Sequence, residues 1–423
     1  MLVALAAVAA ALAAPGYASA SSLQAPAPVP RPNTGGPFGY ENACAAGTCW
    51  RLSGRSAVIH WTTRGLDAPP LNDDNRDGIP DYVREALDAA DHSLTTFQRE
   101  GFLAPLPDTG GGDSKPDIYI TRFSQLPPDE RPAGVAFAHT RAVGGAFVII
   151  SNSLDRDPRR ALGSLRTTVA HELFHLVQYA FTPDGGMPRW VAEGTASAME
   201  FVVYPQTVDV SVEAHVDRWL RQTWRPLYDE RFGCDRCYGG ALWWYVVHHA
   251  EGGVLPEYFG RLYGYQQAGR PINRGLQPLT ETFRRAGYRS LYHAFTNFAF
   301  ALYRASFIPT ATYTLSARPR WRQTRVQTVA GLSMHYVPVR VRARARVVGV
   351  DVYTGGGPFP DVRLVVGGPR GRVVQPRIRT ARGVRHLTFI TRLRTARERR
   401  NIVLIVTSGR QRGARYLVQY AGA

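Results

Sequence analysis

The sequence predicts an α+β fold, in which a mixed sheet with its helices is followed by a β-sandwich. Apolar residues recur with strand-like and then helical spacing up to about residue 304. Beyond about residue 309 they alternate with polar residues at period two, as in strands with one buried face. The composition changes at the same place, because residues 304–423 hold 24 arginines against three carboxylates. These patterns favour a long domain of mixed sheet and helices followed by a shorter β domain.

The N-terminus reads as a secretion signal over residues 1–20. An apolar run is followed by small residues, with Ala18-Ser19-Ala20 as the cleavage site. Residues 21–37, rich in Pro, Ala and Gly, are expected to be a flexible leader. An uncleaved anchor is the alternative, but no other stretch approaches the roughly 20 apolar residues of a membrane span. We therefore expect a secreted chain with no transmembrane helix after processing.

Residues 38–305 are expected to form the mixed domain. Strands are predicted at 56–63, 116–123 and 145–152, and a helix at 81–98. Further helices are predicted near 165–181, from Pro188, and near 212–224, 239–250 and 291–304. The strand at 145–152 precedes the helix at 165–181 and is expected to be available for pairing with an extended peptide.

A run of oxygen-bearing residues follows the first of these strands. Its spacing matches the first part of a calcium loop, with Gly78 at the sharp turn and Arg84 where a closing glutamate is expected. An acidic turn that caps the following helix is the alternative. The candidate calcium ligands are Asp73, Asn75, Asp77, the Ile79 carbonyl and Asp81.

The segment HELFH at residues 171–175 is the most informative motif. Two histidines four apart on a helix lie one turn above the other, so both imidazoles reach one ion, and Glu172 lies beside an open coordination position. Leu165, Val169, Leu173 and Val177 form a core-facing ridge on roughly the opposite side. A buried, hydrogen-bonded His/Glu group without a metal is the alternative.

Glu193 in the segment WVAEGTA is the candidate third ligand, on a helix that begins near Pro188 after a turn at residues 183–186. Two nitrogens and one carboxylate leave a position for water, whereas structural zinc sites are closed by four protein ligands. The composition therefore favours a catalytic zinc site. A carboxylate placed for the helix dipole alone is the other explanation.

HELFH followed by WVAEGTA resembles the gluzincin group of zinc metallopeptidases. It is similar in particular to an uncharacterised family of secreted bacterial metalloproteases that joins a DxNxDGIPDY segment, here Asp73 to Tyr82, to such a core. The resemblance covers about residues 50–305. It implies a zincin-like domain, hydrolysis of peptide bonds in a protein or peptide substrate, Zn²⁺ held by His171, His175 and Glu193, and Glu172 as general base.

Two features of the family pattern are incomplete here. Gluzincins often carry a carboxylate four residues after the third ligand, but this position is Ser197, so Glu200 one turn later is a candidate substitute. The donor that would stabilise the oxyanion is expected from a later segment. Tyr238 is the candidate, with Tyr245 and two histidines further along the same segment, and ordinary core packing is the alternative for that stretch.

Four cysteines fall into two close pairs, Cys44 with Cys49 and Cys234 with Cys237. Export favours two local disulfides, although three connectivities are open. A zinc site of four thiolates is the alternative.

The net charge of +18 comes from residues 304–423, expected as an Arg-rich β-sandwich accessory domain at 310–423. Its arginines are expected on one sheet face, where they either coat a solvated surface or bind an anionic cell envelope or polysaccharide. Nucleic acid is not expected, because lysine clusters and interleaved aromatic platforms are missing.

The leading hypothesis is a secreted zinc endopeptidase. An exopeptidase and a catalytically inactive envelope- or polysaccharide-binding protein are the alternatives, and retention of Glu172 argues against the second, because metal binding alone does not require it.

Overall fold

The computed structural model describes most of the chain, and the elements named below lie in this part. The expected signal at residues 1–20 lies outside the described residues. Of the expected leader, only β1 (Ser22–Gln24) is described, paired antiparallel with β2. The described residues are 22–24, 49–108, 113–123, 126–127, 131–137, 146–154, 158–182, 186–207, 210–230, 234–250, 253–306, 322–323, 327–354, 359–381, 384–408 and 414–422.

The chain divides into two compact units whose boundaries differ from the expected change of domain at 305–310. The first unit contains Met1–Glu213 and Trp244–Pro278, and the second contains Ala214–Trp243 and Leu279–Ala423. Helices expected in the first domain thus belong with the β-rich part. The mixed α+β class is confirmed.

The first unit is built on a six-stranded sheet with the order β1-β2-β3-β4-β6-β5. Strands β3, β4 and β6 are parallel to one another, and the neighbours at both sides run antiparallel. Because β6 lies between β4 and β5, it is not free to pair with a peptide, so that expectation was wrong. Among the described strands, β1 and β5 lie at the two edges of this sheet. The bounds are β2 (Cys49–Ser53), β3 (Val58–Thr62), β4 (Asp117–Thr121), β5 (Gly134–Phe137) and β6 (Phe147–Ser151).

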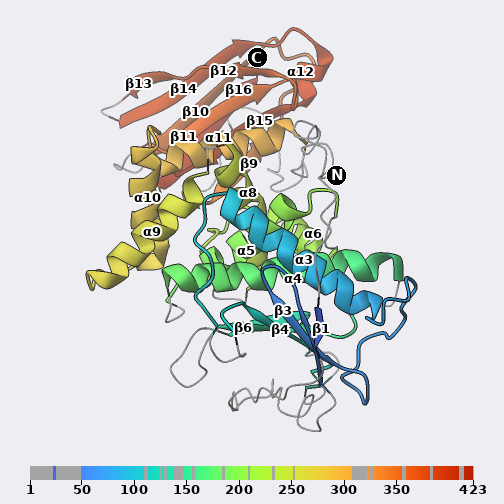
Figure 1. Cartoon of the computed structure of the whole chain (residues 1–423). Coiled ribbons are helices and arrows are strands. Elements are labelled where there is room, and N and C mark those ends of the chain that lie inside the picture. Colours follow the sequence, from blue (N-terminus) through green and yellow to red (C-terminus); the bar gives the residue numbers. More distant parts are fainter. Residues whose placement is uncertain are drawn as a thin grey trace. The chain divides into compact units, whose positions relative to one another are not determined.

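Two long helices, α3 (Asp81–Arg99) and α4 (Pro158–Phe181), lie on one face of this sheet (Figure 1). Pro80 and Pro158 stand at the starts of these helices. Proline suits this place because it has no backbone N–H, and an N–H in the first turn would have no partner within the helix. α5 (Arg189–Val203) packs against α4, as does α9 (Val254–Gln267). The predicted ridge is confirmed: Leu165, Val169, Leu173 and Val177 are fully buried.

Three helices cross the boundary between the units: α6 (Val210–Leu220), α8 (Ala241–Ala250) and α10 (Leu276–Arg285). The short helix η1 (Asn273–Gly275) belongs to the first unit. The second unit also contains α7 (Asp235–Gly239), α11 (Leu291–Arg304) and α12 (Ala396–Arg400).

The second unit contains two antiparallel sheets that share one hydrophobic cluster. One has the order β13-β14-β10-β16-β7, with β8 also paired to β16, and the other has the order β12-β11-β15-β9. The bounds are β7 (Arg322–Gln323), β8 (Gln327–Val329), β9 (Met334–Pro338), β10 (Val347–Thr354), β11 (Asp361–Val366), β12 (Arg372–Val374), β13 (Arg377–Ala381), β14 (Val384–Arg392), β15 (Ile402–Thr407) and β16 (Ala414–Gly422).

α11 belongs with these strands because its inner face is buried on them. The Thr296 hydroxyl lies 2.6 Å from that of Thr407 on β15, and the Tyr336 hydroxyl donates to the Ala299 carbonyl at 2.7 Å. A cut near residue 309 would therefore separate α11 from the strands that cover it. This contact explains why the division does not fall at 305–310.

The Arg-rich run after β9 is not a strand, in contrast to the period-two, strand-like pattern expected beyond about residue 309. Residues 339–346 connect β9, in one sheet, to β10, in the other. Arg340, Arg342, Arg344 and Arg346 are exposed on this connection. These four arginines thus do not lie on a sheet face. Within the described part of the chain, no helix is long and apolar enough to cross a membrane.

Candidate metal centre

α4 carries the two histidines and the glutamate of HELFH in its buried middle. His171, Glu172 and His175 are each 8–9 % exposed. The two imidazole rings lie 4.9 Å apart, edge to face, as expected for positions one helical turn apart. The helical spacing therefore brings together the two imidazoles that the sequence predicts as ligands.

α5 brings Glu193 to this pair. The helix begins at Arg189, directly after Pro188, so the predicted start is confirmed. The Glu193 Oε2 atom lies 3.3 Å from His171 Nε2 and 3.6 Å from His175 Nε2. One carboxylate oxygen thus faces both imidazoles.

These three residues fit a divalent cation by their geometry and chemistry. Their ligand atoms lie within 4.8 Å of one another, and no other group of three His, Cys, Asp or Glu side chains among the described residues does so. Both Nδ1 atoms are engaged elsewhere, so the two Nε2 atoms are the nitrogens that face Glu193. Two imidazoles and one carboxylate are the donor set of catalytic zinc sites.

Glu200 orients His171. Its Oε1 atom accepts a hydrogen bond from His171 Nδ1 at 2.7 Å, and the Ser197 hydroxyl lies 3.5 Å from the same nitrogen. The side chain of Glu200 is buried at 4 % exposure. Glu200 therefore supplies the carboxylate contact that the sequence analysis placed there as a substitute. Such a contact holds the ring tautomer that leaves Nε2 free for a metal.

Gln178 orients His175, a contact that was not predicted from the sequence. Its Oε1 atom accepts from His175 Nδ1 at 2.8 Å. Its amide nitrogen donates to the Ala192 carbonyl at 2.8 Å and to the Thr195 hydroxyl at 2.9 Å, both on α5. The side chain is 1 % exposed, so one amide positions a ligand and joins the two helices. Gln178 lies three residues after His175 on the same helix, and residues at this spacing are neighbours, so the sequence spacing could have identified it.

Glu172 faces the open edge strand. The backbone N–H of Ala136 on β5 donates to its carboxylate. A Cβ atom added at Gly134 would lie 2.6 Å from Glu172 Cγ, which no real contact allows. The sequence analysis did not identify either β5 residue, because only folding brings this strand to α4.

The charges of the site favour a bound cation. Burial alone would lower the pKa of His171, but hydrogen bonds to Glu193 and Glu200, with the charges of Glu200 and Glu172, raise it well above its usual value. Burial alone would raise the pKa of Glu193, but its hydrogen bonds to His171 and His175 hold it well below its usual range. The carboxylates thus stabilise positive charge at His171.

The pKa of Glu172 is raised by burial, although the two nearby histidines oppose this shift. A carboxyl group with a raised pKa is a better proton acceptor than an exposed one.

Tyr238 belongs to the second unit, on α7, where its ring lies 5.1 Å from that of His215. Its expected role as oxyanion donor stays a prediction. Tyr245 on α8 packs against Phe201, with ring centroids 6.1 Å apart. His248, on the same helix, pairs with Glu100 at 2.9 Å. Both contacts suit ordinary packing of α8 in the first unit.

The four candidate side chains of the calcium loop accept hydrogen bonds from backbone N–H groups of the loop itself. Asp73 accepts from the N–H groups of Asp77 and Gly78, at 3.1 and 2.8 Å. Asp77 accepts from the Ile79 N–H at 2.9 Å and forms an ion pair with Arg84. The remaining candidates, Asn75 and Asp81, accept from the N–H groups of Asp77 at 2.9 Å and of Asp74 at 3.2 Å. Calcium binding here stays a prediction.

Cys234 and Cys237 form the predicted local disulfide, at the start of α7. The thiolate zinc site therefore has no support from this pair. Cys44 lies outside the described residues, so its expected bond to Cys49 does too.

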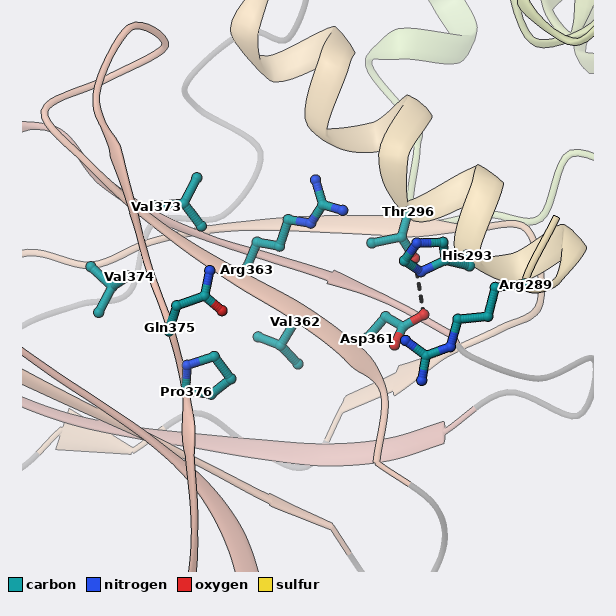
Figure 2. Close-up of a pocket in the computed structure, with 10 residues that line it drawn as sticks. All are labelled: Arg289, His293, Thr296, Asp361, Val362, Arg363, Val373, Val374, Gln375 and Pro376. Carbon is teal, nitrogen blue, oxygen red and sulfur yellow. Dashed lines mark hydrogen bonds between the residues drawn. The ribbon is translucent and has the colours of Figure 1, made fainter. Parts of the chain in front are cut away.

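The second unit also contains an open cavity of about 470 Å³ between α11 and strands β11 and β12 (Figure 2). Arg289, His293, Asp361 and Arg363 contribute to its lining, and the Thr296 hydroxyl donates to Asp361 at 3.2 Å. Arg363 also bonds Asn297. The cavity therefore combines both signs of charge and is not a uniformly cationic site.

Comparison of the chain with known protein families gives no match, and no curated protein matches it. The functional argument therefore depends on the geometry of the site.

Proposed function

We propose that this protein is a zinc-dependent peptidase that hydrolyses peptide bonds, with His171, His175 and Glu193 as metal ligands and Glu172 as general base. The observation that carries the proposal is the approach of one Glu193 oxygen to both histidine Nε2 atoms, at 3.3 and 3.6 Å. The hydrogen bonds that hold both Nδ1 atoms support it, since they direct the opposite ring nitrogens toward a metal.

Zinc bound by three protein ligands lowers the pKa of a bound water to about 7 and polarises a carbonyl group. Glu172 would accept the proton of the attacking water and later transfer it to the nitrogen of the cleaved bond. Its burial and raised pKa suit this exchange. Glu193 and the two histidines would hold the metal without changing protonation state during the cycle.

The open edge of β5 would bind the substrate. Gly134 and Ala136 are partly exposed there, and β5 pairs with β6 through its other side. An extended peptide that adds to this edge by backbone hydrogen bonds would pass beside Glu172. Such pairing does not require a free chain end, so it favours an endopeptidase.

We assign the first unit to the zincin-like fold and the second to a β-sandwich. The sheet of the first unit, with its antiparallel edge and the ligand-bearing α4 on one face, supports the former. Two antiparallel sheets around one cluster support the latter. The apolar N-terminal run and the Cys234–Cys237 disulfide favour a secreted protein.

A catalytically inactive envelope- or polysaccharide-binding protein is the second candidate, supported by the exposed arginines of residues 340–346. Glu172 argues against it: a buried carboxylate with a raised pKa is costly and has no use in attachment. An exopeptidase would need a group that captures a chain terminus, and no described residue at the site is assigned to that role.

The test is digestion of casein and of a peptide library by the full chain, before and after removal of zinc with a chelator. We expect internal cleavage that chelation abolishes and added zinc restores. Release of single terminal residues would indicate an exopeptidase. Absence of turnover by the zinc-loaded protein would favour the binding protein.

Glu172→Gln provides the matched variant for this test. The amide keeps the size of the side chain but neither accepts nor returns a proton, so turnover should be lost while zinc content and thermal unfolding stay unchanged. Glu257→Gln, an exposed position on α9, is the control and should behave like the wild type. Normal hydrolysis by Glu172→Gln would refute the assignment of the base.

A further inference from the structure

We propose that Tyr179 is a further catalytic residue, whose hydroxyl donates a hydrogen bond to the oxyanion formed when water adds to the substrate carbonyl. The inference rests on the proposed function and names a donor other than Tyr238. Oxyanion stabilisation requires a pre-positioned donor.

The position of Tyr179 on α4 places it beside the metal ligands. His171, His175 and Tyr179 follow one another at intervals of four residues, so their side chains share one face of the helix. Long side chains in helices lean toward the N-terminal turn. The phenol of Tyr179 therefore leans toward the turn that carries His175. Tyr179 as a whole is partly buried.

The hydroxyl of Tyr179 and the carboxylate of Glu172 both bond the backbone of one residue of β5, Ala136. The Tyr179 hydroxyl donates to the Ala136 carbonyl at 3.3 Å, and the Ala136 N–H donates to Glu172. A distance of 3.3 Å is long for an O–H···O bond, which is commonly about 2.7–2.8 Å. Because this bond is weak, the Tyr179 hydroxyl loses little when it donates to a substrate oxygen instead of the Ala136 carbonyl.

The electrostatics agree with this position. Burial raises the pKa of Tyr179, and the negative charges of Glu172 and Glu193 raise it further. The hydroxyl therefore keeps its proton at neutral pH and remains a donor. Tyr82, Tyr245 and Tyr258, also in the first unit, have pKa values raised by burial alone. Tyr179 is thus within electrostatic reach of both the base and the third ligand.

The chemical step balances with these groups. The water oxygen forms a bond to the carbonyl carbon, the π electrons move onto the carbonyl oxygen, and the water proton moves to Glu172. Tyr179 keeps its proton and donates a hydrogen bond to the newly negative oxygen. When the C–N bond breaks, that oxygen regains its double bond and the proton on Glu172 moves to the leaving nitrogen.

The test compares Tyr179→Phe with Tyr82→Phe in the zinc-loaded full chain. Tyr82 is the matched control, because its hydroxyl also donates to a strand carbonyl, that of Ser151 at 2.6 Å. Tyr179→Phe should lower kcat by roughly 10²–10³-fold, with little change in KM, zinc content or unfolding temperature. It should also weaken binding of a phosphinic peptide, measured by calorimetry, since this probe carries an oxyanion-like oxygen. Tyr82→Phe should change stability but neither kcat nor phosphinic peptide binding.

Two outcomes overturn the proposal separately from the proposed function. If the wild type cleaves peptides and Tyr179→Phe matches it, or loses only as much as Tyr82→Phe, Tyr179 has no catalytic role. A loss confined to Tyr238→Phe would give the role to that residue. A zinc-loaded wild type that cleaves no peptide would instead overturn the proposed function, and the role of Tyr179 with it.

Discussion

Gly134 lies so close to Glu172 that a Cβ atom at this position would come within 2.6 Å of the Glu172 Cγ atom and 2.9 Å of its Oε1 atom. The edge strand β5 and the helix α4 therefore approach each other at a contact that only glycine permits. This contact holds the carboxylate next to the strand edge at which we propose that substrate binds.

Gly134→Ala should reduce peptide hydrolysis by roughly tenfold to a hundredfold, because displacement of a reacting group by about 1 Å has costs of this order. The proposed zinc ligands lie on α4 and α5, so zinc content should stay near one per chain. Gly260→Ala on α9, where an added Cβ meets nothing within 4 Å, is the control and should retain full activity. The measurement is kcat/KM together with metal analysis. Full activity of Gly134→Ala would show that Glu172 tolerates the shift.

Removal of either group that orients a histidine should weaken zinc binding. We expect Glu200→Gln and Gln178→Ala each to raise the Kd for zinc about 10–100-fold, measured by competition with a chromogenic chelator. Gln178→Ala should also lower the unfolding temperature, since it leaves the Ala192 carbonyl and the Thr195 hydroxyl without the amide that now bonds them. Glu257→Gln is the control. Unchanged zinc affinity in both variants would mean that helix packing alone holds the rings.

Calcium, if it binds the loop at residues 73–81, should stabilise the first unit. A ligand that binds only the folded state at a hundredfold excess over its Kd adds about 2.7 kcal/mol to the free energy of unfolding. Added calcium should therefore raise the unfolding temperature of the wild type. Asp77→Ala should abolish the rise, and Asp74→Ala, at a position without a predicted ligand, should keep it. An unchanged melting curve of the wild type at millimolar calcium would leave an acidic turn capped by its own backbone.

The stability of the second unit should fall in acid because of His335. Burial lowers the pKa of this histidine to about 4, and its Nδ1 atom lies 2.7 Å from the Tyr416 hydroxyl. An unfolded histidine has a pKa near 6.5, so between about pH 6.5 and 4 the unfolded chain binds a proton that the folded chain does not. The contribution of the neutral ring is therefore complete above about pH 6.5 and is lost as the pH falls toward 4.

For one such proton, the free energy of unfolding changes by at most about 1.4 kcal/mol for each pH unit. Urea unfolding at several pH values between 7 and 4 measures it, and His335→Gln should flatten the dependence. His92→Gln, at an exposed position on α3, should leave it unchanged. Equal pH dependence in His335→Gln and the wild type would show that other groups account for the acid sensitivity.

Much of the candidate site could be predicted because its parts are local. The positions of His171, Glu172 and His175 follow from helical periodicity, and the sequence predicts the start of α5 near Pro188 from helix-start signals. Glu193 was predicted from ligand chemistry, and Glu200 from its distance along the helix. All four expectations depend on spacing within one helix or on one short connection.

The parts that could not be predicted depend on contacts between distant segments. Gly134 and Ala136 reach Glu172 only after β5 joins the edge of a sheet and α4 packs against it. The same packing gives Tyr179 its contact with Ala136. In the second unit, α11 belongs with β15 because of buried contacts more than a hundred residues apart in sequence. No local pattern encodes these partners.

By itself, the sequence determined the α+β class, the helix that carries two histidines and a glutamate, and the third ligand's helix, because helical periodicity and ligand chemistry act over a few residues. Only the tertiary structure decided which edge strand contacts Glu172, that residues 214–243 and 279–305 belong to the second unit, and that residues 339–346 connect two sheets instead of forming a strand. These outcomes depend on which apolar faces bury each other, and many segments of this chain carry similar faces, so the choice among partners is made only when the whole chain packs.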